Sequence, residues 1–391
     1  MTPMSDQQEP ASSPSSGPRR PRVVVLFGGR SGEHSVSCAT AAGVLSAIDR
    51  QRYEVVPVGI TRNGRWVLVD DDPAALELAE GRPPVEITEE GTGRGTVTLP
   101  QGGRGCVLVA LPGQPPRELA VDVVLPLLHG PYGEDGTVQG LLEMAGLRYV
   151  GCGVLASAAG MDKQVTKVLL GAAGIPTVPH VVVSPRTWRR DPELVLDACE
   201  ALDYPLFVKP CRAGSSLGIT KVDRAQDLSA AITAASVVDP KVLVESGVQA
   251  REIEVAVLGG RDGQAPRVAE PGEVLMDPEQ GAGDFYDYQT KYLAHDAVSM
   301  VCPAPLRSEE RELLRDTAAR AFDALGGEGL MRVDFFLTAQ GQALVNEVNT
   351  MPGFTPYSMY PYMWQVSGTD YTSLVSELIE LALERSTDVN R

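Results

Sequence analysis

Apolar and polar residues follow one another along the chain in patterns that predict alternating strands and helices. The apolar run at 22–27 ends in Gly28-Gly29, which is typical of a buried strand that leads into a turn. Small residues at 37–48 predict a helix, and residues 53–60 predict a second strand. A strand, loop, helix and strand in this order predict a parallel sheet covered by helices.

The next segment changes character before the strand pattern returns. Residues 70–113 are acidic and rich in Gly and Pro, so we expect surface hairpins and loops there. The apolar run at 121–128 predicts another buried strand, which leads into His129-Gly130. The sequence therefore predicts a first α/β domain at 22–158, and its Ser-, Pro- and Gln-rich start at 1–21 predicts a disordered tail.

The second half of the chain predicts α+β structure. Helical spacing at 161–173 is ended by Gly174-Ile175-Pro176. Strands are expected at 206–208, 242–244 and 252–258, and a helix is expected at 308–325. The irregular stretch at 281–295 between them has the length of a lid or a linker.

Residues 331–349 predict a β-hairpin that carries its charges on one face. With the turn centred on Gln340-Gly341, Asp334 faces Glu347 and Arg332 faces Asn349, and side-chain alternation places all four on the same side. The other side collects the apolar residues Val333, Phe335, Leu337, Leu344 and Val348. Two opposed carboxylates repel, and a hard cation such as Mg²⁺ would relieve that repulsion. The alternative is a solvated hairpin whose acids are balanced by arginine.

Two further motifs are candidates for binding phosphate or an oxyanion. Gly353 lies in the segment 350–358, where its backbone N–H can approach a ligand closely. Lys209 ends an expected strand and precedes a Gly/Ser loop at 213–218, whose amides could wrap phosphate oxygens. This is not a P-loop, because the lysine precedes the glycines. Alone, the first motif could be an ordinary turn and the second a flexible connector.

Composition narrows the class of protein. The chain has 391 residues, enough for two or three domains, and a formal charge of −17, which disfavours nucleic-acid binding. Its six cysteines form no C-x-x-C pair, which disfavours zinc sites and a secreted disulfide scaffold. We find no apolar run of the roughly 18 residues that a membrane helix needs, and no signal-peptide pattern at the start. We therefore expect a cytoplasmic protein.

Taken together, the motifs resemble the ATP-grasp superfamily and, within it, the D-alanine–D-alanine ligase family. The matching stretches occur in the family's order and cover nearly all of the chain from 27 to 358. They are 28–37, 128–136, Met161-Asp162-Lys163, 209–218, 285–292, 332–334 and 347–353.

The resemblance implies a Rossmann-like parallel-sheet domain at 22–158, followed by a two-lobed ATP-grasp fold. The central lobe would span 159–245, and the C-terminal lobe would span 246–391 with a lid loop at 281–295. It further implies ligation of two D-alanine molecules at the expense of ATP, through a D-alanyl phosphate, for peptidoglycan precursor synthesis. The implied cofactors are ATP and two Mg²⁺, with Mn²⁺ as a possible substitute, and the implied assembly is a homodimer.

The resemblance also implies roles for individual residues. The ATP-binding residues would be Lys163, Lys209, Ser216, Glu245, Ser246, Val248 and Glu252. The metal ligands would be Asp334, Glu347 and Asn349. Glu33 would meet the ammonium of the first D-alanine, with His129 close by. Arg332 and the Gly353 amide would stabilise the tetrahedral intermediate, while Ser358 and Lys291 would bind the second carboxylate. Tyr292 would link to Ser215 and Glu33 when the lid closes.

Several of these residues also have simpler interpretations. Lys163 could be a solvated helix lysine, His129 a hydrogen-bonded histidine at a strand end, and Glu33 an acid at a helix N-terminus. Three other functions stay open from the sequence. They are a ligase that takes D-lactate or D-serine second, a nucleotide-binding regulator without turnover, and a dinucleotide oxidoreductase. Lys291-Tyr292 in the lid favours the dipeptide-forming type.

Overall fold

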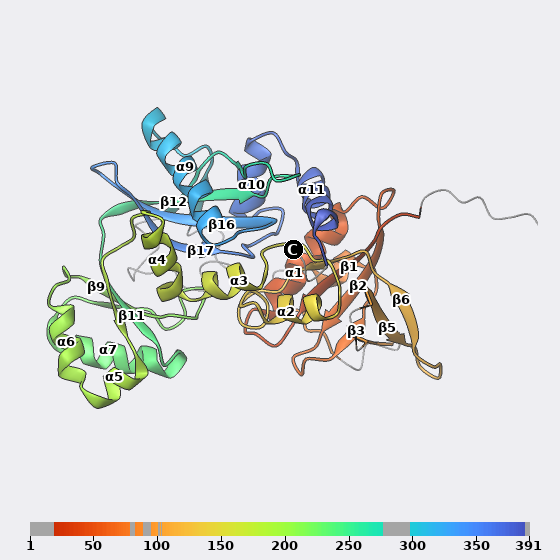
Figure 1. Cartoon of the computed structure of the whole chain (residues 1–391), viewed down its shortest axis with the longest axis horizontal. Coiled ribbons are helices and arrows are strands. Elements are labelled where there is room, and N and C mark those ends of the chain that lie inside the picture. The colour runs from red at the N-terminus through yellow and green to blue at the C-terminus, as the bar shows by residue number, and fades with distance from the viewer. Residues whose placement is uncertain are drawn as a thin grey trace, which may run out of the picture.

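A computed structural model describes residues 19–78, 83–88, 95–100, 102, 104–276 and 298–387. Along the long axis, the first and second sheets lie at opposite ends and the third sheet lies between them, while the last helix returns to the first sheet (Figure 1). The predicted lid at 281–295 and residues 1–18 of the predicted tail lie outside the described residues. Within the described part, no helix is both long and apolar enough to cross a membrane.

The first sheet has seven strands in the order β6-β5-β4-β3-β2-β1-β7. The predicted parallel core is confirmed, because β1 (Arg22–Gly28) pairs in parallel with β2 (Glu54–Ile60) and β7 (Val123–Pro126). The other strands pair antiparallel, so the sheet is mixed. They are β3 (Trp66–Leu68), β4 (Thr96–Thr98), β5 (Cys106–Ala110) and β6 (Arg117–Ala120).

Surface hairpins and loops were predicted at 70–113, and β4 and β5 do pair antiparallel, but their place at the surface was predicted wrongly. Val97, Val107 and Val109 point inward and are buried in a core with β1 and β7. These strands are three and five residues long, so their alternation is too short to stand out from the Gly- and Pro-rich surroundings. A short 3₁₀ helix at Pro73–Leu76 also lies in this segment.

Helices cover both faces of the first sheet. On one face lie α1 (His34–Ala47), which begins three residues before the predicted start at 37, and α11 (Tyr371–Glu384). On the other face α2 (Thr137–Met144) contributes Val138 and Leu142 to the core. The C-terminal helix thus packs on the N-terminal sheet, which joins the two ends of the described chain into one body.

The second sheet is antiparallel, in the order β10-β9-β11-β8. Its strands are β8 (His180–Val183), β9 (Leu206–Pro210), β10 (Thr220–Val222) and β11 (Val242–Ser246). Its covering helices are α5 (Pro185–Arg190), α6 (Pro192–Cys199) and α7 (Ala225–Val238). Val208 and Val244 face this helical core, so strand alternation turns Lys209 and Glu245 to the opposite side.

The third sheet is antiparallel along the path β15-β14-β12-β16-β17, with β13 (Arg267–Val268) paired to β12. The strands are β12 (Ala250–Leu258), β14 (Gly272–Met276), β15 (Val298–Val301), β16 (Leu330–Thr338) and β17 (Ala343–Asn349). Helix α9 (Ser308–Ala324) packs on one face over Val255 and Val333. Helix α10 (Met359–Val366) covers part of the other face, where Tyr360 donates a hydrogen bond to the Val257 carbonyl.

The predicted helix at 161–173 is in fact the end of one helix and the whole of the next. Helix α3 (Val154–Met161) stops at Asp162, and α4 (Lys163–Ala172) begins directly after it. The Asp162 carboxylate accepts the Val165 N–H at 3.2 Å, which caps α4. The cap fixes the first residue of α4, Lys163, at the start of the helix.

The six cysteines all lie in the described part of the chain, and all are buried and free. Cys152, for example, is 1 % exposed, and its thiol donates to the Leu330 carbonyl at 3.4 Å. This agrees with the expectation that the cysteines form no disulfide scaffold.

Candidate active site

A cavity of about 660 Å³ gathers half of the residues that the sequence singled out. Its wall comes from α1 and Glu33 before it, the loop after β9, strands β16 and β17, and the loop before α10. The predicted residues that line it are Glu33, His129, Lys163, Ser215, Arg332, Glu347, Asn349, Gly353 and Ser358. Residues separated by up to 325 positions therefore meet at one site, and substrate-sized space lies between them.

The hairpin prediction is confirmed at the end that lines the cavity. Asp334 is opposite Glu347 and Arg332 is opposite Asn349, and all four lie on the face away from α9. Nearer the turn the register differs, because Leu337 pairs with Ala343 and a bulge lies between Asp334 and Phe335. The turn is centred half a residue earlier than predicted. The one extra residue that the bulge adds to β17 restores the predicted pairing of Asp334 with Glu347.

The same bulge makes one prediction wrong. Leu344 pairs with Phe336 and is half-buried on the polar face, whereas Ala343 and Val345 fill the core. A one-residue change of register moves every side chain beyond it to the other face. The remaining predicted core residues of the hairpin, Val333, Phe335, Leu337 and Val348, are buried as expected.

Arg332 and Asp334 form a largely buried ion pair on the site face, with side chains 12 % and 14 % exposed. Arg332 donates Nε–H and Nη2–H to the two oxygens of Asp334, each at 2.7 Å, and Asn349 Nδ2 donates to Asp334 Oδ2 at 2.9 Å. Burial lowers the pKa of Arg332, but Asp334 and Glu254 raise it by more, so it lies well above its ordinary value. The guanidinium is therefore a permanent cation at the cavity wall.

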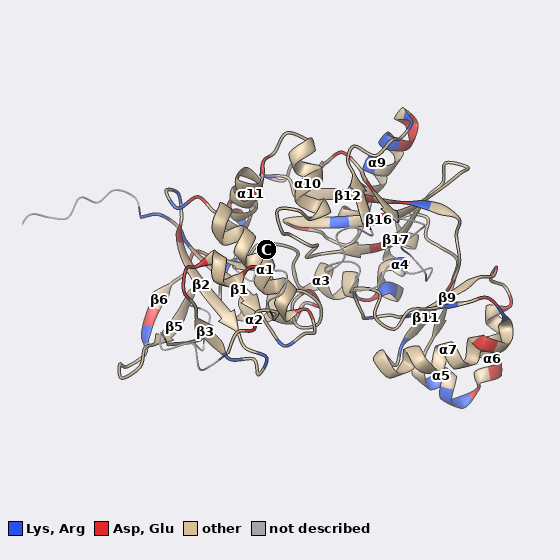
Figure 2. Ribbon diagram, turned by 180° about the vertical axis from the view of Figure 1, so that it is seen from behind, with Lys and Arg blue, Asp and Glu red and all other residues tan. Residues whose placement is uncertain are grey.

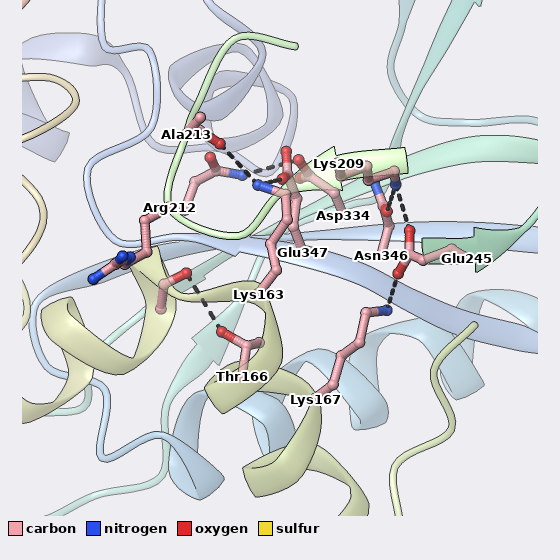
Figure 3. Close-up of polar contacts among 12 residues, drawn as sticks. Lys163, Thr166, Lys167, Lys209, Arg212, Ala213, Glu245, Asp334, Asn346 and Glu347 are labelled. Carbon is pink, nitrogen blue, oxygen red and sulfur yellow. Dashed lines mark hydrogen bonds and ion pairs between the residues drawn. The ribbon is translucent and has the colours of Figure 1, made fainter. Parts of the chain in front are cut away.

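Glu347 and Lys163 pair directly across the gap between β17 and α4. Lys163 Nζ lies 3.0 Å from Glu347 Oε2 and donates to the Ala213 carbonyl at 2.9 Å (Figure 3). Burial lowers the pKa of Lys163, but the Glu347 carboxylate raises it by more, so it ends above its ordinary value. The interpretation of Lys163 as a solvated surface lysine is wrong, because its side chain is only 11 % exposed.

Lys209 belongs to a second, adjoining cluster with Glu245 and Lys167. The sequence analysis did not single out Lys167. Glu245 lies between two lysines, with Oε1 2.6 Å from Lys167 Nζ and Oε2 2.6 Å from Lys209 Nζ. Lys209 also donates to Asn346 Oδ1 at 3.2 Å, which ties β9 to β17. Lys167 could have been found from its spacing, since it lies one helical turn after Lys163 and on the same face.

Glu33 and Ser215 meet although they are far apart in the chain. Ser215 Oγ donates to Glu33 Oε1 at 2.6 Å, which joins the start of α1 to the loop after β9. Ser215 and Ser216 have φ of 52° and 57°, a left-handed conformation that is uncommon outside glycine. We attribute this strained backbone to the shape that the loop after β9 adopts where it lines the cavity.

His129 is a fully hydrogen-bonded histidine that also lines the cavity. Its Nε2 lies 3.1 Å from Thr40 Oγ1, and its Nδ1 lies 3.2 Å from the Met351 carbonyl. Burial holds the pKa of His129 below its ordinary value, so the ring is neutral at pH 7. Both sequence interpretations, a satisfied strand-end histidine and a neighbour of the substrate, are compatible with this position.

Gly353 and Ser358 lie together at the entrance to α10. A β-carbon on Gly353 would come within 3.2 Å of Ser358 Oγ, so this loop has little room for a side chain. Ser358 Oγ accepts the Thr355 N–H at 3.1 Å and lies 2.8 Å from Thr355 Oγ1. The hydroxyl is thereby held at the cavity wall.

Two acids that received no role from the sequence also line the cavity. Glu254 on β12 lies 3.2 Å from Arg332, and its position opposite Asp334 in the sheet could have been inferred from strand alternation. Glu134 accepts the Gly130 N–H at 2.5 Å. Burial, the Glu33 carboxylate and other neighbours raise the pKa of Glu134 to about 8. Nothing in its local sequence signals this burial, because it results from the packing of distant segments.

The remaining predicted residues lie at the edge of the site or outside the described chain. Ser246 is buried and its Oγ accepts the Asp203 N–H at 3.1 Å, while Val248 is half-buried. Glu252 is exposed on the same face of β12 as Glu254. The other predicted residues, Lys291 and Tyr292, lie outside the described residues.

The residues predicted to hold metal have the chemistry that magnesium requires. Asp334, Glu347 and Asn349 offer oxygen atoms from one face of two paired strands, and the two carboxylates already attract the cationic groups of Arg332 and Lys163. In the described residues, no three His, Cys, Asp or Glu side chains gather into a metal cluster. The predicted set has only two carboxylates, and its third member is an amide.

Fold and site together define an ATP-grasp protein, with two antiparallel α+β lobes that bring lysines and acids to a shared cleft. Two family models match the sequence: "D-ala D-ala ligase N-terminus" at residues 22–152 and "D-ala D-ala ligase C-terminus" at residues 169–380. The chain belongs to the D-alanine–D-alanine ligase family.

Individual relatives agree with this assignment. The chain is 54% identical to the D-alanine–D-alanine ligase of Arthrobacter sp. (strain FB24), over 95% of this chain and 96% of that protein. It is 53% identical to the corresponding protein of Pseudarthrobacter chlorophenolicus, over 97% of each. Among solved structures, the VanG D-Ala:D-Ser ligase of Enterococcus faecalis matches with a TM-score of 0.79 and 34% identity, over 93% of this chain and 100% of that one. The D-alanine–D-alanine ligase of Coxiella burnetii matches with a TM-score of 0.76 and 33% identity, over 94% of each chain.

Proposed function

We propose that this protein joins two molecules of D-alanine into D-alanyl-D-alanine, with conversion of ATP to ADP and phosphate, for peptidoglycan precursor synthesis. The observation that carries the proposal is the cavity in which Lys163, Arg332 and Glu347 meet Glu33 and Ser215. The names of the relatives that match over nearly the whole chain support the same reaction.

The reaction requires activation of a carboxylate, because oxide is too poor a leaving group for an amine to displace. Transfer of the γ-phosphoryl group of ATP to the first D-alanine gives a D-alanyl phosphate, from which phosphate can leave. Lys163 and Lys209 would bind the triphosphate, since their present carboxylate, carbonyl and amide partners are oxygen atoms that phosphate oxygens can replace. On the nucleotide, Glu245, Ser246 and Val248 would hold the adenine.

Other residues of this part of the site would be Ser216 at the phosphates and Glu252 at the ribose hydroxyls. Asp334, Glu347 and Asn349 would hold two magnesium ions, or manganese in their place, which when bound supply positive charge to the phosphoryl groups. The exposed position of Glu252 on the site face of β12 is compatible with a contact to a sugar.

The remaining residues would orient the two amino acids. Glu33, held by Ser215, would receive the ammonium of the first D-alanine, with neutral His129 beside it. Ser358, with Lys291, would bind the carboxylate of the second D-alanine. The neutral amine of that molecule would attack the acyl carbon, and phosphate would leave.

Two features would protect and stabilise this step. The Arg332 guanidinium and the Gly353 N–H would stabilise the oxyanion of the tetrahedral intermediate. The predicted lid, with Tyr292 linking to Ser215 and Glu33, would exclude water from the acyl phosphate.

The test is incubation of the purified protein with ATP, Mg²⁺ and D-alanine. We expect ADP, phosphate and dipeptide in equal amounts, and no phosphate release above background with L-alanine. Equal phosphate release with the two enantiomers would overturn the proposal. Binding of ATP without turnover of any D-amino acid would favour a nucleotide-binding regulator instead.

A second candidate shares the chemistry but takes D-serine as the second substrate, as the name of the VanG relative indicates for that protein. D-Lactate is the corresponding hydroxy-acid alternative. Competition assays with D-alanine, D-serine and D-lactate across pH distinguish them, because an amine must lose a proton before it attacks and a hydroxyl group carries no such charge. We expect D-alanine to be preferred, since the 54%-identical relative bears the D-alanine–D-alanine name.

Domain boundaries at 158 and 245, a cytoplasmic location and a homodimer remain predictions.

A further inference from the structure

The cluster of Lys167, Glu245 and Lys209 carries one more positive than negative charge in a nearly solvent-free place. The exposed fractions of these side chains are 1 %, 2 % and 10 %. Each oxygen of Glu245 pairs with a different ammonium at the same distance of 2.6 Å (Figure 3). A buried charge costs free energy unless it is paired, so the excess positive charge favours an anionic ligand.

The two lysines are not equivalent within this cluster. Lys167 lies on α4 and is the more deeply buried, and the ion pair that the structure shows for it is the one with Glu245. Lys209 has a second partner in Asn346 Oδ1 on β17, one residue before Glu347, and it is the more exposed of the two. Lys209 is therefore the member that can turn toward a ligand at β17, while Lys167 stays with the carboxylate.

We propose that Lys167 is a positioning residue for triphosphate binding, which it assists by holding Glu245 so that Lys209 can leave that carboxylate. Without Lys167, Glu245 and Lys209 form a closed neutral pair, and a phosphate must separate two opposite buried charges before it can bind Lys209. With Lys167 in place, Glu245 keeps a counter-ion after Lys209 has moved. The inference rests on the proposed function in one respect, which is that Lys209 binds the phosphates of ATP.

The direct test measures binding rather than turnover, by titration calorimetry with ATP and with inorganic tripolyphosphate, which has no adenine. Because a charge-assisted contact of Lys209 is weakened, we expect Lys167→Met to bind both ligands about tenfold more weakly than the wild type. The matched control is Lys221→Met. Lys221 lies on β10, which pairs with the β9 strand of Lys209, and its side chain is 29 % exposed, so this variant should bind as the wild type does.

The double variant Lys167→Met/Glu245→Gln distinguishes positioning from a merely structural role. Removal of Glu245 frees Lys209 from the pair, so tripolyphosphate affinity should recover to within about threefold of the wild type, because the charge contact is restored. A structural defect at Lys167, or a direct contact of Lys167 with phosphate, would not be repaired by a second substitution. An unchanged affinity in Lys167→Met, or no recovery in the double variant, would overturn the proposal.

Two further measurements keep the outcome interpretable. Lys167→Met retains the neutral Glu245–Lys209 pair and should fold, and thermal unfolding checks this. If it does not fold, Lys167→Gln replaces it with a polar side chain, and the same loss and recovery of affinity are expected. Wild-type protein that binds ATP but makes no dipeptide contradicts the proposed function and leaves this inference standing.

Discussion

Charged side chains at the cavity are buried in groups of opposite sign. Arg332 lies between Asp334 and Glu254, and Lys163 lies against Glu347. When one member of such a group is removed, its partner is left without a counter-ion away from water, and this costs free energy. Each such residue therefore contributes to stability as well as to the proposed chemistry, and the two effects need separate measurements.

The variant Glu347→Gln separates the effect on stability from the effect on catalysis at the predicted metal site. It removes a negative ligand and the partner of Lys163, so we expect the Mg²⁺ concentration for half-maximal activity to rise roughly 10- to 100-fold. The measurement is dipeptide formation against Mg²⁺ after chelator treatment, with thermal unfolding alongside. Glu118→Gln, on the exposed strand β6, is the control and should behave as the wild type. An unchanged Mg²⁺ requirement in Glu347→Gln would remove this residue from the metal site.

Glu134 gives a pH prediction. Burial and the Glu33 carboxylate raise the pKa of Glu134 from 4.5 to about 8, so the folded chain binds a proton there that the unfolded chain has lost. Its contribution to stability is therefore full below about pH 4.5 and is lost as pH rises through about 8. Chemical denaturation of the metal-free protein should show Glu134→Gln gaining stability over the wild type between pH 6 and pH 9. A difference that stays constant across this range would contradict the raised pKa.

For individual residues, the sequence predicted the residue types and the order of the motifs, but it did not predict which charged groups form pairs. Lys163 and Glu347 were both predicted near phosphate or metal, yet their mutual contact required the position of α4 relative to β17. Lys167 had a detectable signal in its helical spacing. Glu134 had none, because its burial comes from segments that are distant in sequence.

At the scale of elements, the β16–β17 hairpin and the start of α4 fix the geometry of the site. Strand alternation was enough to place Asp334 and Glu347 together, since it is a property of the backbone alone. The bulge was not predictable from alternation, and it reversed the position of Leu344. The break between α3 and α4 was also missed, although Asp162 is a typical N-cap residue.

Asp162→Ala tests the importance of that break. The Asp162 carboxylate caps α4 through the Val165 N–H and also pairs with Lys241. Because a lost cap typically costs about 1 kcal/mol, we expect a loss of this order in the free energy of unfolding. Fraying of the first turn should also displace Lys163 and raise the KM for ATP with a smaller effect on the KM for D-alanine. Asp191→Ala, which removes the cap of α6 away from the cavity, should lower stability and leave both KM values unchanged.

At the scale of the whole molecule, the cavity exists only because three sheets and the last helix are packed together. The order of elements along the chain predicted the parallel core, whereas the two lobes that follow it were implied by the family resemblance. The sequence did not predict that α11 returns to the first sheet, because nothing in an amphipathic helix identifies its partner. Figure 2 shows that Lys and Arg, like Asp and Glu, are spread over all three parts of the chain, so charge alone does not mark the site.

The expected homodimer can be assigned a surface to test. Met144 at the end of α2 and Leu155 at the start of α3 are 83 % and 74 % exposed on neighbouring helices. Large apolar side chains that are exposed on adjoining helices are candidates for an interface. We expect light scattering to show a dimer for the wild type and a monomer for Met144→Glu/Leu155→Glu. Val237→Glu, at an equally exposed apolar position on α7, should remain dimeric, and a wild type that is monomeric at all concentrations would contradict the prediction.

The burial of every cysteine has a practical consequence. Burial raises the pKa of Cys38, Cys152 and Cys211 to about 12, and reactive thiolate is scarce at such sites in neutral solution. A cysteine engineered at exposed Val237 should therefore be labelled by a maleimide long before any natural thiol. Site-specific fluorophores can therefore be attached without first replacing the natural cysteines. The slower labelling of those natural thiols would then measure the rate at which the interior opens to solvent.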